Sequence, residues 1–185
     1  MGSPKQHVRV GGLTFLDHVW ERLQSVRDLL DTIVMVGRAG DTASLAAAQR
    51  RGAVWIENPR PEDGPLSSIR CGLSGFAASA GFLLWPIDHP LPGVSVVQAI
   101  LERAASHPEE IVVPSVGGRR GHPTYFPGWA QPALQAAPLE AGARWVLQQN
   151  PDRIFHVETE DPWIRENLNT PESLTRAESL FRTRA

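Results

Sequence analysis

Apolar, β-branched runs of strand length alternate with amphipathic stretches along this chain, and this alternation constrains its fold more than any other feature. The predicted strands are residues 32–36, 54–56, 82–85, 111–113 and 154–157. The spacing of apolar residues predicts helices over residues 14–26, 42–51, 66–79, 94–105 and 141–149, with a closing helix from Pro171. Strands that alternate with helices are typical of a parallel sheet covered by helices. The sequence therefore predicts an α/β protein, in which the Pro- and Gly-rich stretches 58–65 and 117–128 are interpreted as loops.

Composition limits the class of function. A length of 185 residues, with 42% hydrophobic and 21% charged residues, suits one globular domain over residues 1–185 without an internal linker. The net charge of −2, without a basic block, argues against a nucleic-acid partner. No apolar stretch reaches membrane-spanning length, and the start lacks a signal-peptide pattern. The single cysteine, Cys71, fits a reducing compartment, so we expect a cytoplasmic protein with no membrane partner.

The apolar run at 82–85 ends in Pro86-Ile87-Asp88-His89-Pro90. In open α/β sheets ligands bind beyond the carboxyl ends of the strands, so Asp88 is a candidate for handling a divalent metal or a phosphate. The alternative is ordinary turn chemistry, for which Asp is also favoured.

The loop that precedes the helix at 66–79 contains candidate nucleotide-binding groups. Gly64 lets the backbone approach a ligand closely, and the first amides of the helix can accept an anion or contact the edge of a base. Ser67 and Ser68 are equally well explained as helix caps. Arg70 fits either a phosphate contact or surface ion pairing.

Residues 114–123 follow a strand, are rich in Gly, and bring Arg119, Arg120 and His122 together. This segment suits the capture of an anionic acceptor, with His122 acting as a protonated cation or as a neutral hydrogen-bond donor. The alternative is a glycine-rich hairpin with exposed arginines.

Both ends of the chain add candidates. Thr170 and Pro171 form a helix start, as N-cap and first helical residue. Capping leaves Asn167 and Asn169 unexplained, and their oxygens beside a carboxylate suit Mg²⁺. Lys5 is either an ammonium placed against phosphates or a solvated terminal lysine.

Taken in order, these segments resemble the MobA/MocA-like nucleotidyltransferases of molybdenum-cofactor biosynthesis, a group of NTP transferases with a glycosyltransferase-A-like fold. Residues 64–66 resemble the base-contacting segment of guanylyl-transferring members, and residues 64–72 resemble the G-x-x-x-S-[LI]-R-x-G-L pattern of cytidylyl-transferring ones. The other matching segments are Asp88-His89-Pro90 with a metal-binding D-x-P, Gly118-Arg119-Arg120-Gly121-His122-Pro123 with G-x-R-G-H-P, and Asn167-Leu168-Asn169-Thr170-Pro171-Glu172 with N-I-N-T-P-E or D-I-D-T-P-E.

This resemblance implies a three-layer, Rossmann-like fold with a mixed, mostly parallel sheet flanked by helices. It also implies transfer of a nucleoside monophosphate from an NTP to a phosphorylated acceptor, with release of pyrophosphate. CTP as donor and molybdopterin as acceptor rank first because the Gly-His-Pro segment is the longer match. Guanylyl transfer, and other phosphorylated acceptors, remain alternatives, and a molybdoenzyme or its chaperone is a possible protein partner.

The resemblance also assigns roles to residues. Asp88 and Asn169 are expected to hold Mg²⁺, and Lys5 and Asp88 are the expected catalytic residues. The expected nucleotide-binding residues are Lys5, Gly64, Pro65, Leu66, Ser68 and Arg70, and the expected acceptor-binding residues are Arg120, Gly121, His122 and Pro123.

The family opens with a strand and the loop L-A-A/G-G-x-S-x-R-M-G-x-P-K, whereas this chain begins at Met1-Gly2-Ser3-Pro4-Lys5. We therefore expect the domain to be incomplete at its N-terminus, lacking the first strand and most of the Gly-rich loop. A non-catalytic binding module, without the loop that cradles the nucleotide phosphates, is the alternative from a different class of function. Asn in place of Asp at 167 and 169 lowers the charge of the expected metal site.

Overall fold

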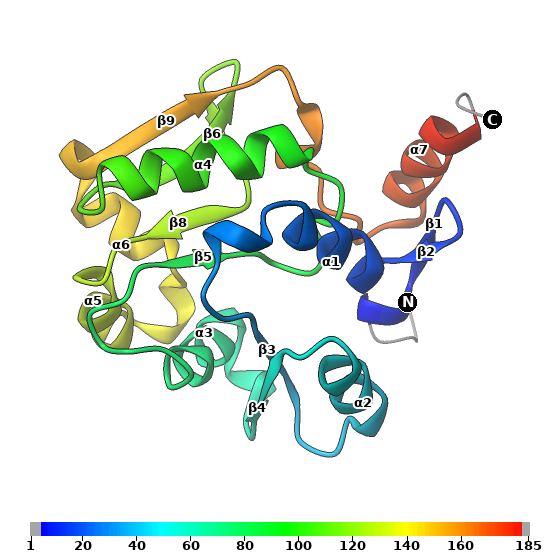
Figure 1. Cartoon of the computed structure of the whole chain (residues 1–185), viewed down its shortest axis with the longest axis horizontal. Helices are drawn as coiled ribbons and strands as arrows, with labels where there is room; N and C mark the ends of the chain where they lie inside the picture. Colours follow the sequence, from blue (N-terminus) through cyan, green and yellow to red (C-terminus); the bar gives the residue numbers. More distant parts are fainter. Residues whose placement is uncertain (1–4, 183–185) are drawn as a thin grey trace.

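A computed structural model describes residues 5–182; residues 1–4, which belong to the predicted Gly-rich loop, and residues 183–185 lie outside the described part. Its elements follow one another as Figure 1 shows. The helices are α1 Phe15–Ser25, α2 Thr42–Arg50, α3 Pro65–Leu73, α4 Val94–Ser106, α5 Ala130–Ala136, α6 Arg144–Gln149 and α7 Pro171–Arg182. The strands are β1 Arg9–Val10, β2 Leu13–Thr14, β3 Val34–Arg38, β4 Val54–Asn58, β5 Phe82–Leu84, β6 Ile111–Val116, β7 Arg119–Arg120, β8 Thr124–Phe126 and β9 Ile154–Glu158.

The first and last helices begin where their capping residues predict. The Thr14 hydroxyl accepts a hydrogen bond from the backbone N–H of Asp17 (3.1 Å), and the Asp17 carboxylate accepts one from the N–H of Thr14 (3.0 Å). This reciprocal pair satisfies two amides at the start of α1 that have no partner within the helix. At the start of α7, the Thr170 hydroxyl accepts from the N–H of Ser173 (3.2 Å). Both predicted helix starts are therefore confirmed.

The main sheet has five strands and is mixed. Its strands run in the order β5-β8-β6-β7, with β9 beside β6. Only the β6–β9 pair in this sheet is parallel, while β8 is antiparallel to both β5 and β6. The α/β class and the mixed sheet are confirmed, but the expectation that its pairing is mostly parallel is not.

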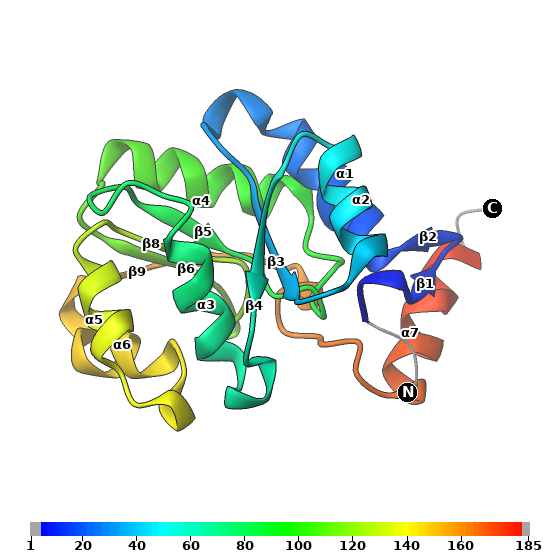
Figure 2. The ribbon, with the colours of Figure 1, turned by 90° about the horizontal axis from the view of Figure 1, so that it is seen from below.

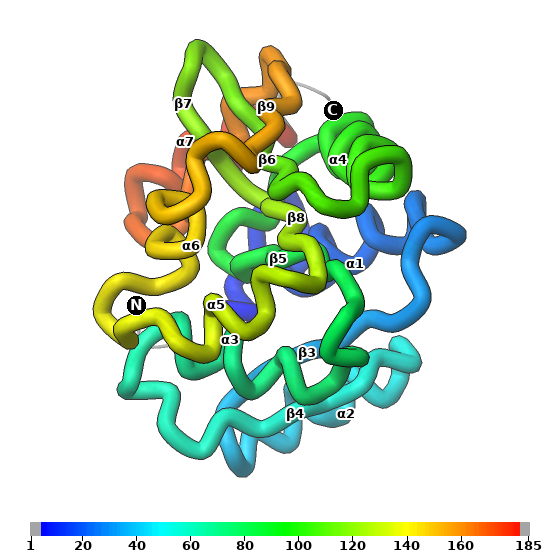
Figure 3. Tube along the Cα trace, turned by 90° about the vertical axis from the view of Figure 1, so that its left-hand side faces the viewer, coloured from blue at the N-terminus to red at the C-terminus, as the bar shows by residue number. Residues whose placement is uncertain are grey.

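The interpretation of residues 117–128 as a loop is wrong. The segment holds β7, which extends beyond the rest of the sheet near β9 (Figure 3), and β8, which occupies a central place between β5 and β6. The three residues of β8 lie between Pro123 and Pro127. This stretch is too short to show the alternation of apolar and polar residues that identifies a strand. Burial explains the pairing, since the side chains of Thr124 and Phe126 are both inside the protein.

Side chains of alternate residues enter two different cores, one on each face of the main sheet. Ile111 and Val113 pack with Leu66 of α3 and Leu134 of α5. Val112, between them, packs with Ile100 and its neighbours on α4. Figure 2 shows α4 on one side of the sheet and α3, α5 and α6 on the other. The predicted three-layer arrangement is thereby confirmed.

Strands β3 and β4 form a separate, parallel two-stranded sheet that α3 covers. Close contact is possible because α3 has a glycine where it meets β3: a Cβ atom on Gly72 would lie 3.1 Å from Val36. Just beyond α3, a Cβ atom on Gly75 would lie 2.8 Å from Val34 and 2.9 Å from Ile56. Between residues 5 and 182, no strand joins β3 to β5.

The two ends of the described chain pack together beside the main sheet (Figure 1). Val10 of the β1–β2 hairpin and Ala177 of α7 share one apolar cluster. The N–H of Gly11 also donates to the Glu178 carboxylate at 3.0 Å. This packing brings the first described residues close to the loop that precedes α7. Of the helices formed by residues 5–182, none is long and apolar enough to cross a membrane.

Candidate active site

Three segments far apart in the sequence meet at the Asp88 carboxylate. The Lys5 ammonium lies 3.1 Å from Asp88 Oδ2, and the Asn169 amide nitrogen donates to the same oxygen at 3.1 Å. The backbone N–H of Leu168 donates to the carbonyl of Asp88 at 2.8 Å, which fixes the two loops together. The structure therefore brings together Lys5, Asp88 and Asn169, three residues that the sequence predicts for one site.

The turn after β5 places Asp88 at this junction. The N–H of His89 donates to the carbonyl of Pro86 at 3.0 Å, which closes the turn. The indole N–H of Trp85 donates to the carbonyl of His89 at 2.8 Å. Pro86 and Pro90 restrict the backbone further because their rings fix φ. Asp88 is thus held on a rigid turn beyond the carboxyl end of β5.

Lys5 is positioned by the residue that follows it. The Gln6 amide donates to the Asp41 carboxylate at 2.8 Å and to the Ser44 hydroxyl at 2.9 Å, which joins the turn Lys5–His7 to the start of α2. The N–H of Val8 donates to the carbonyl of Lys5 at 3.0 Å. The backbone of Lys5 is therefore anchored, while its side chain remains 50% exposed.

The Asp88 carboxyl is ionised at neutral pH. Burial raises its pKa, but the hydrogen bond and charge of Lys5 and the hydrogen bond from Asn169 outweigh burial and hold the pKa below its ordinary value. The side chain of Asp88 is 21% exposed, so one face of this anion remains open to a ligand.

Asp88 and Asn169 have the donor chemistry of a magnesium site. A carboxylate and an amide both offer the hard oxygen atoms that Mg²⁺ prefers. Among residues 5–182 no group of three or more His, Cys, Asp and Glu side chains is arranged to hold a metal. One carboxylate is sufficient where substrate phosphates and water complete the coordination of Mg²⁺. The residues present therefore fit a metal ion that arrives with a nucleotide.

The predicted acceptor segment docks against the turn Pro162–Ile164, just ahead of Asn169. The N–H of His122 donates to the carbonyl of Ile164 at 2.7 Å, and the N–H of Gly121 donates to that of Pro114 at 2.8 Å. The His122 ring lies 4.6 Å, centroid to centroid, from the ring of His89. Through His89, this segment is a neighbour of Asp88.

His122 and His89 present buried polar atoms without partners. The Nδ1 atom of each ring is buried and has no hydrogen-bond partner among residues 5–182. Burial, with the nearby charge of His89, lowers the pKa of His122 to about 4. At neutral pH His122 is therefore an uncharged imidazole, which favours the neutral donor over the protonated cation as its mode of binding.

This burial makes stability depend on pH. Because the pKa of His122 is about 4 when folded and 6.5 ordinarily, the unfolded chain binds its proton more readily. The associated stabilisation is present above pH 6.5 and is lost as the pH falls towards 4. We expect about 3 kcal/mol of unfolding free energy to disappear across this interval. Urea unfolding across this range should show a shallower fall for His122→Gln, and an unchanged fall for the exposed His107→Gln.

Gly121 is required for this docking. A Cβ atom at this position would lie 2.4 Å from the carbonyl oxygen of Ile164, a backbone atom that cannot yield as a side chain would. We expect Gly121→Ala to lower the free energy of unfolding by about 2 kcal/mol, the usual cost of overpacking. Gly93→Ala is the matched control because its Cβ would meet nothing closer than 3.4 Å. Equal urea midpoints for the two variants would contradict this account.

The other predicted acceptor residues differ in their exposure to solvent. Pro123 is buried, and its peptide bond with His122 is cis. Arg120 is exposed on β7 and donates from its Nε atom to the ring of His156 at 2.9 Å. Arg120 and the exposed turn beside it are the accessible part of this segment.

The predicted nucleotide segment at the start of α3 is ordered by hydrogen bonds. Gly64 has a φ of 87° and precedes Pro65, the first residue of the helix. The buried Asn58 donates to the hydroxyls of Ser67 (2.8 Å) and Ser68 (3.0 Å). Pro65 has no N–H, and the N–H of Ser67 donates to the carbonyl of Gly64 at 3.2 Å. The segment therefore has a fixed conformation, and nucleotide binding by it stays a prediction.

Two side chains of this segment are engaged elsewhere. Leu66 is 0% exposed and belongs to the main core, so only its backbone is available to a nucleotide. Arg70 donates to the carbonyls of Leu134 (3.1 Å) and Ala137, at the end of α5. Its guanidinium compensates carbonyls that have no partner within the helix, which is a structural use the sequence does not reveal.

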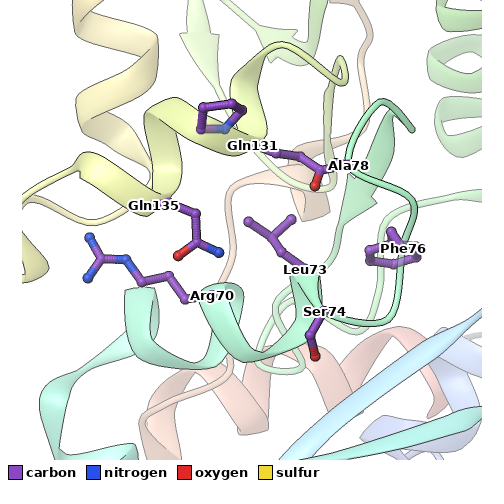
Figure 4. Close-up of a pocket in the computed structure, with 8 residues that line it drawn as sticks. Arg70, Leu73, Ser74, Phe76, Ala78, Gln131 and Gln135 are labelled. Carbon is purple, nitrogen blue, oxygen red and sulfur yellow. The ribbon is translucent and has the colours of Figure 1, made fainter.

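Two cavities adjoin α3, and Asp88 is not among the residues that line either of them. One of about 290 Å³ lies between α3 and α5, beside Arg70, Leu73, Phe76 and Gln131 (Figure 4). Of its polar side chains, Gln131 donates to the carbonyls of Ala77 and Ala80, and Arg70 to those at the end of α5. A second, of about 160 Å³, is lined by residues that include Asn58, Arg60, Asp63 and Ser67. This second cavity borders the predicted base-contacting segment.

His89 is a site residue that motif matching misses, because the pattern D-x-P leaves its middle position open. A second signal lies in composition: Lys5 is the one lysine among the 18 lysine and arginine residues of the chain. This composition distinguishes Lys5 from the other cationic side chains, which are all arginines.

The fold is that of known nucleotidyltransferases. The molybdopterin-guanine dinucleotide biosynthesis protein A of Archaeoglobus fulgidus superposes with a TM-score of 0.72 at 19% identity, over 98% of this chain and 92% of that one. The 2-C-methyl-D-erythritol 4-phosphate cytidylyltransferase of Thermus thermophilus gives 0.72 at 18% identity, over 98% and 95%. The Mycobacterium tuberculosis protein Rv0371c, crystallised in complex with manganese, gives 0.73 at 20% identity, over 96% and 93%. No curated protein matches the chain in sequence.

A comparison of the sequence with protein families identifies the family to which this chain belongs. The chain belongs to the family of the MobA-like NTP transferase domain, whose model matches residues 1–154. Asp88, the Gly64 segment and the Gly121 segment lie inside the matched region, whereas Asn169 lies beyond it.

Proposed function

We propose that this protein transfers a nucleoside monophosphate from an NTP, with CTP first, to a phosphorylated small-molecule acceptor such as molybdopterin. The observation that carries this proposal is the meeting of Lys5 and Asn169 at one oxygen of Asp88, from positions 83 and 81 residues away. A cation, a carboxylate and an amide gathered beyond the end of a strand suit a metal-bound triphosphate. Membership of the NTP transferase family supports the same chemistry.

The transfer itself needs little covalent help from the protein. An oxygen of the acceptor phosphate attacks the α-phosphorus of the NTP, and the bond to the bridging oxygen of the β-phosphate breaks. Pyrophosphate leaves with the electron pair of that bond. Catalysis then depends on holding the two phosphates in line and neutralising their charge.

The residues divide this work. Asp88 and Asn169 would hold the divalent ion, which would neutralise charge on the triphosphate and on the leaving pyrophosphate. Lys5, on an anchored turn, directs its ammonium at the transferred phosphate. Uncharged His122 contributes a directional hydrogen bond to the acceptor, and exposed Arg120 contributes positive charge.

The choice of CTP rests on the segment from Gly64 to Gly72. Asn58 and Ser67 line the smaller cavity, and Asn58 donates to the hydroxyl of the neighbouring Ser68 at 3.0 Å. A base bound there would meet the hydroxyl and backbone groups of this segment. Gly64, Pro65 and Leu66 also fit the guanylyl-transferring pattern, so GTP is the competing donor.

The test compares nucleotides directly. Purified protein with Mg²⁺ and molybdopterin is given CTP, GTP, ATP or UTP, and pyrophosphate release is followed by a coupled assay. We expect CTP to give the highest kcat/KM. Release with GTP alone would reassign the donor and leave the reaction class intact. Nucleotide binding by calorimetry without pyrophosphate release for any donor or phosphorylated acceptor would favour a non-catalytic binding module.

A further inference from the structure

Lys5 and the expected metal ion need the same carboxylate. The Lys5 ammonium lies 3.1 Å from Asp88 Oδ2, and this oxygen also accepts the hydrogen bond from Asn169. A cation at this distance repels a second cation brought to the same group. In the structure Lys5 therefore occupies the side of Asp88 that faces Asn169, the other predicted metal ligand.

The Lys5 side chain can move away from Asp88 without a change in the surrounding backbone. Gln6 is hydrogen-bonded to Asp41, and the N–H of Val8 donates to the carbonyl of Lys5, so the backbone is anchored directly after the lysine and its flexible four-carbon stem can move. The Lys5 side chain is half exposed, so it is not enclosed by the side chains of the described residues. Every other cationic side chain of the Lys and Arg type in the chain is an arginine, whose planar, multidentate group releases a carboxylate less readily.

We propose that Lys5 and the divalent ion are alternative partners of Asp88, so that the protein excludes the metal until a triphosphate draws Lys5 away. This inference rests on the proposed nucleotide-dependent function and adds an order of binding to it. Without nucleotide, the ion pair holds Asp88. With nucleotide, the ammonium pairs with the phosphates and the carboxylate becomes free for the ion. Nucleotide and metal then bind cooperatively, and each strengthens the other by the same factor.

The test is Mn²⁺ binding, measured from the electron paramagnetic resonance signal of the free ion during titration of nucleotide-free protein. We expect Lys5→Met to bind Mn²⁺ about tenfold more tightly than the wild-type protein, because one competing charge is removed. Addition of CTP without acceptor should tighten binding to the wild-type protein much more than binding to Lys5→Met. Lys5→Met combined with Asp88→Asn should lose the gain, which would assign it to this carboxylate.

Arg9→Met is the matched control. Arg9 is an exposed cation on β1, close in sequence, whose guanidinium donates to the carbonyl of Gly12 at 2.6 Å. The substitution Arg9→Met removes the same charge as Lys5→Met but leaves the contacts of Asp88 intact. The Mn²⁺ affinity of this variant should therefore stay within about twofold of wild type, as expected for exposed charges. Equal affinities of Lys5→Met and wild type, equal gains for Lys5→Met and Arg9→Met, or Mn²⁺ binding to neither protein would each overturn the proposal.

The single lysine provides a second readout. Reductive methylation with ¹³C-formaldehyde labels Lys5 and the terminal amine alone, so the side chain gives its own resonance in a two-dimensional spectrum. CTP without metal should shift this resonance, and Asp88→Asn should shift it before any CTP is added. A resonance that ignores both changes would contradict the exchange.

Failure of this inference is separable from failure of the proposed function. Tighter Mn²⁺ binding by Lys5→Met, in a protein that transfers no nucleotide, would retain the exchange at Asp88 and remove the proposed reaction. Nucleotide transfer by a protein whose Mn²⁺ affinity ignores Lys5 would retain the reaction and remove the exchange.

Discussion

Asp88→Asn is expected to reduce kcat/KM for nucleotide transfer by about 10³-fold, since the metal ion supplies several kcal/mol of charge stabilisation. The substitution keeps the shape of the side chain and removes the negative charge. Asn169 and Lys5 lose the anion to which both donate. Steady-state kinetics with saturating Mg²⁺, together with calorimetry of Mg²⁺-CTP binding, measures the effect.

Asp28→Asn is the control for this result. Asp28 is an exposed residue after α1, and its substitution by Asn removes an equal negative charge from the protein surface. Its kcat/KM should remain at the wild-type value. Full activity of Asp88→Asn would remove Asp88 from the metal site, and an equal loss in Asp28→Asn would point to net charge as the cause.

Lys5→Met is expected to lower kcat by about 10²-fold, the usual loss when one preorganised donor to a developing charge is removed. KM should change less, because Lys5 acts on the phosphate being transferred. Lys5→Arg should not restore the rate, since the guanidinium is larger and binds with a different geometry. Single-turnover kinetics with CTP separates the chemical step from product release.

The same variant gives a stringent internal check. Lys5→Met should bind Mn²⁺ more tightly without nucleotide, yet transfer nucleotide more slowly. A general loss of folding would weaken both, and Arg9→Met should change neither. A rate of Lys5→Met equal to that of wild type would exclude a catalytic role for Lys5.

Periodicity predicted the α/β architecture because most of its elements are long enough to show a pattern. The capping residues at Thr14 and Thr170 located two helix starts, and alternate burial of Ile111, Val112 and Val113 follows from two covered faces of the sheet. Strand β8 was not predictable in this way. Its three residues between prolines acquire their conformation from β5 and β6, which only the assembled sheet supplies.

The structure brings some of the predicted site residues together, whereas another of them has a structural use. Lys5, Asp88 and Asn169 meet as expected. Arg70 turns instead to the end of α5, because the unpaired carbonyls there exist only once α5 has formed. No residue type or spacing in the sequence predicts that Arg70 bonds to the carbonyls of Leu134 and Ala137.

The charge state of His122 likewise depends on three-dimensional context. Sequence left open a cationic and a neutral imidazole, and burial beside His89 selects the neutral form. A neutral ring can orient an acceptor by a directional hydrogen bond, whereas Arg120 can attract it over a longer range. In the proposed reaction, Arg120 would therefore contribute to acceptor affinity and His122 to acceptor orientation.

The most direct test of nucleotidyl transfer is to follow the phosphorus atoms of the donor. Two samples of CTP, one labelled with ³²P at the α-phosphate and one at the γ-phosphate, are incubated with protein, Mg²⁺ and molybdopterin. The account predicts that α-label moves to the acceptor while γ-label is recovered in pyrophosphate, and that Asp88→Asn abolishes both. Transfer of γ-label to the acceptor, or equal transfer of α-label by Asp88→Asn, would contradict it.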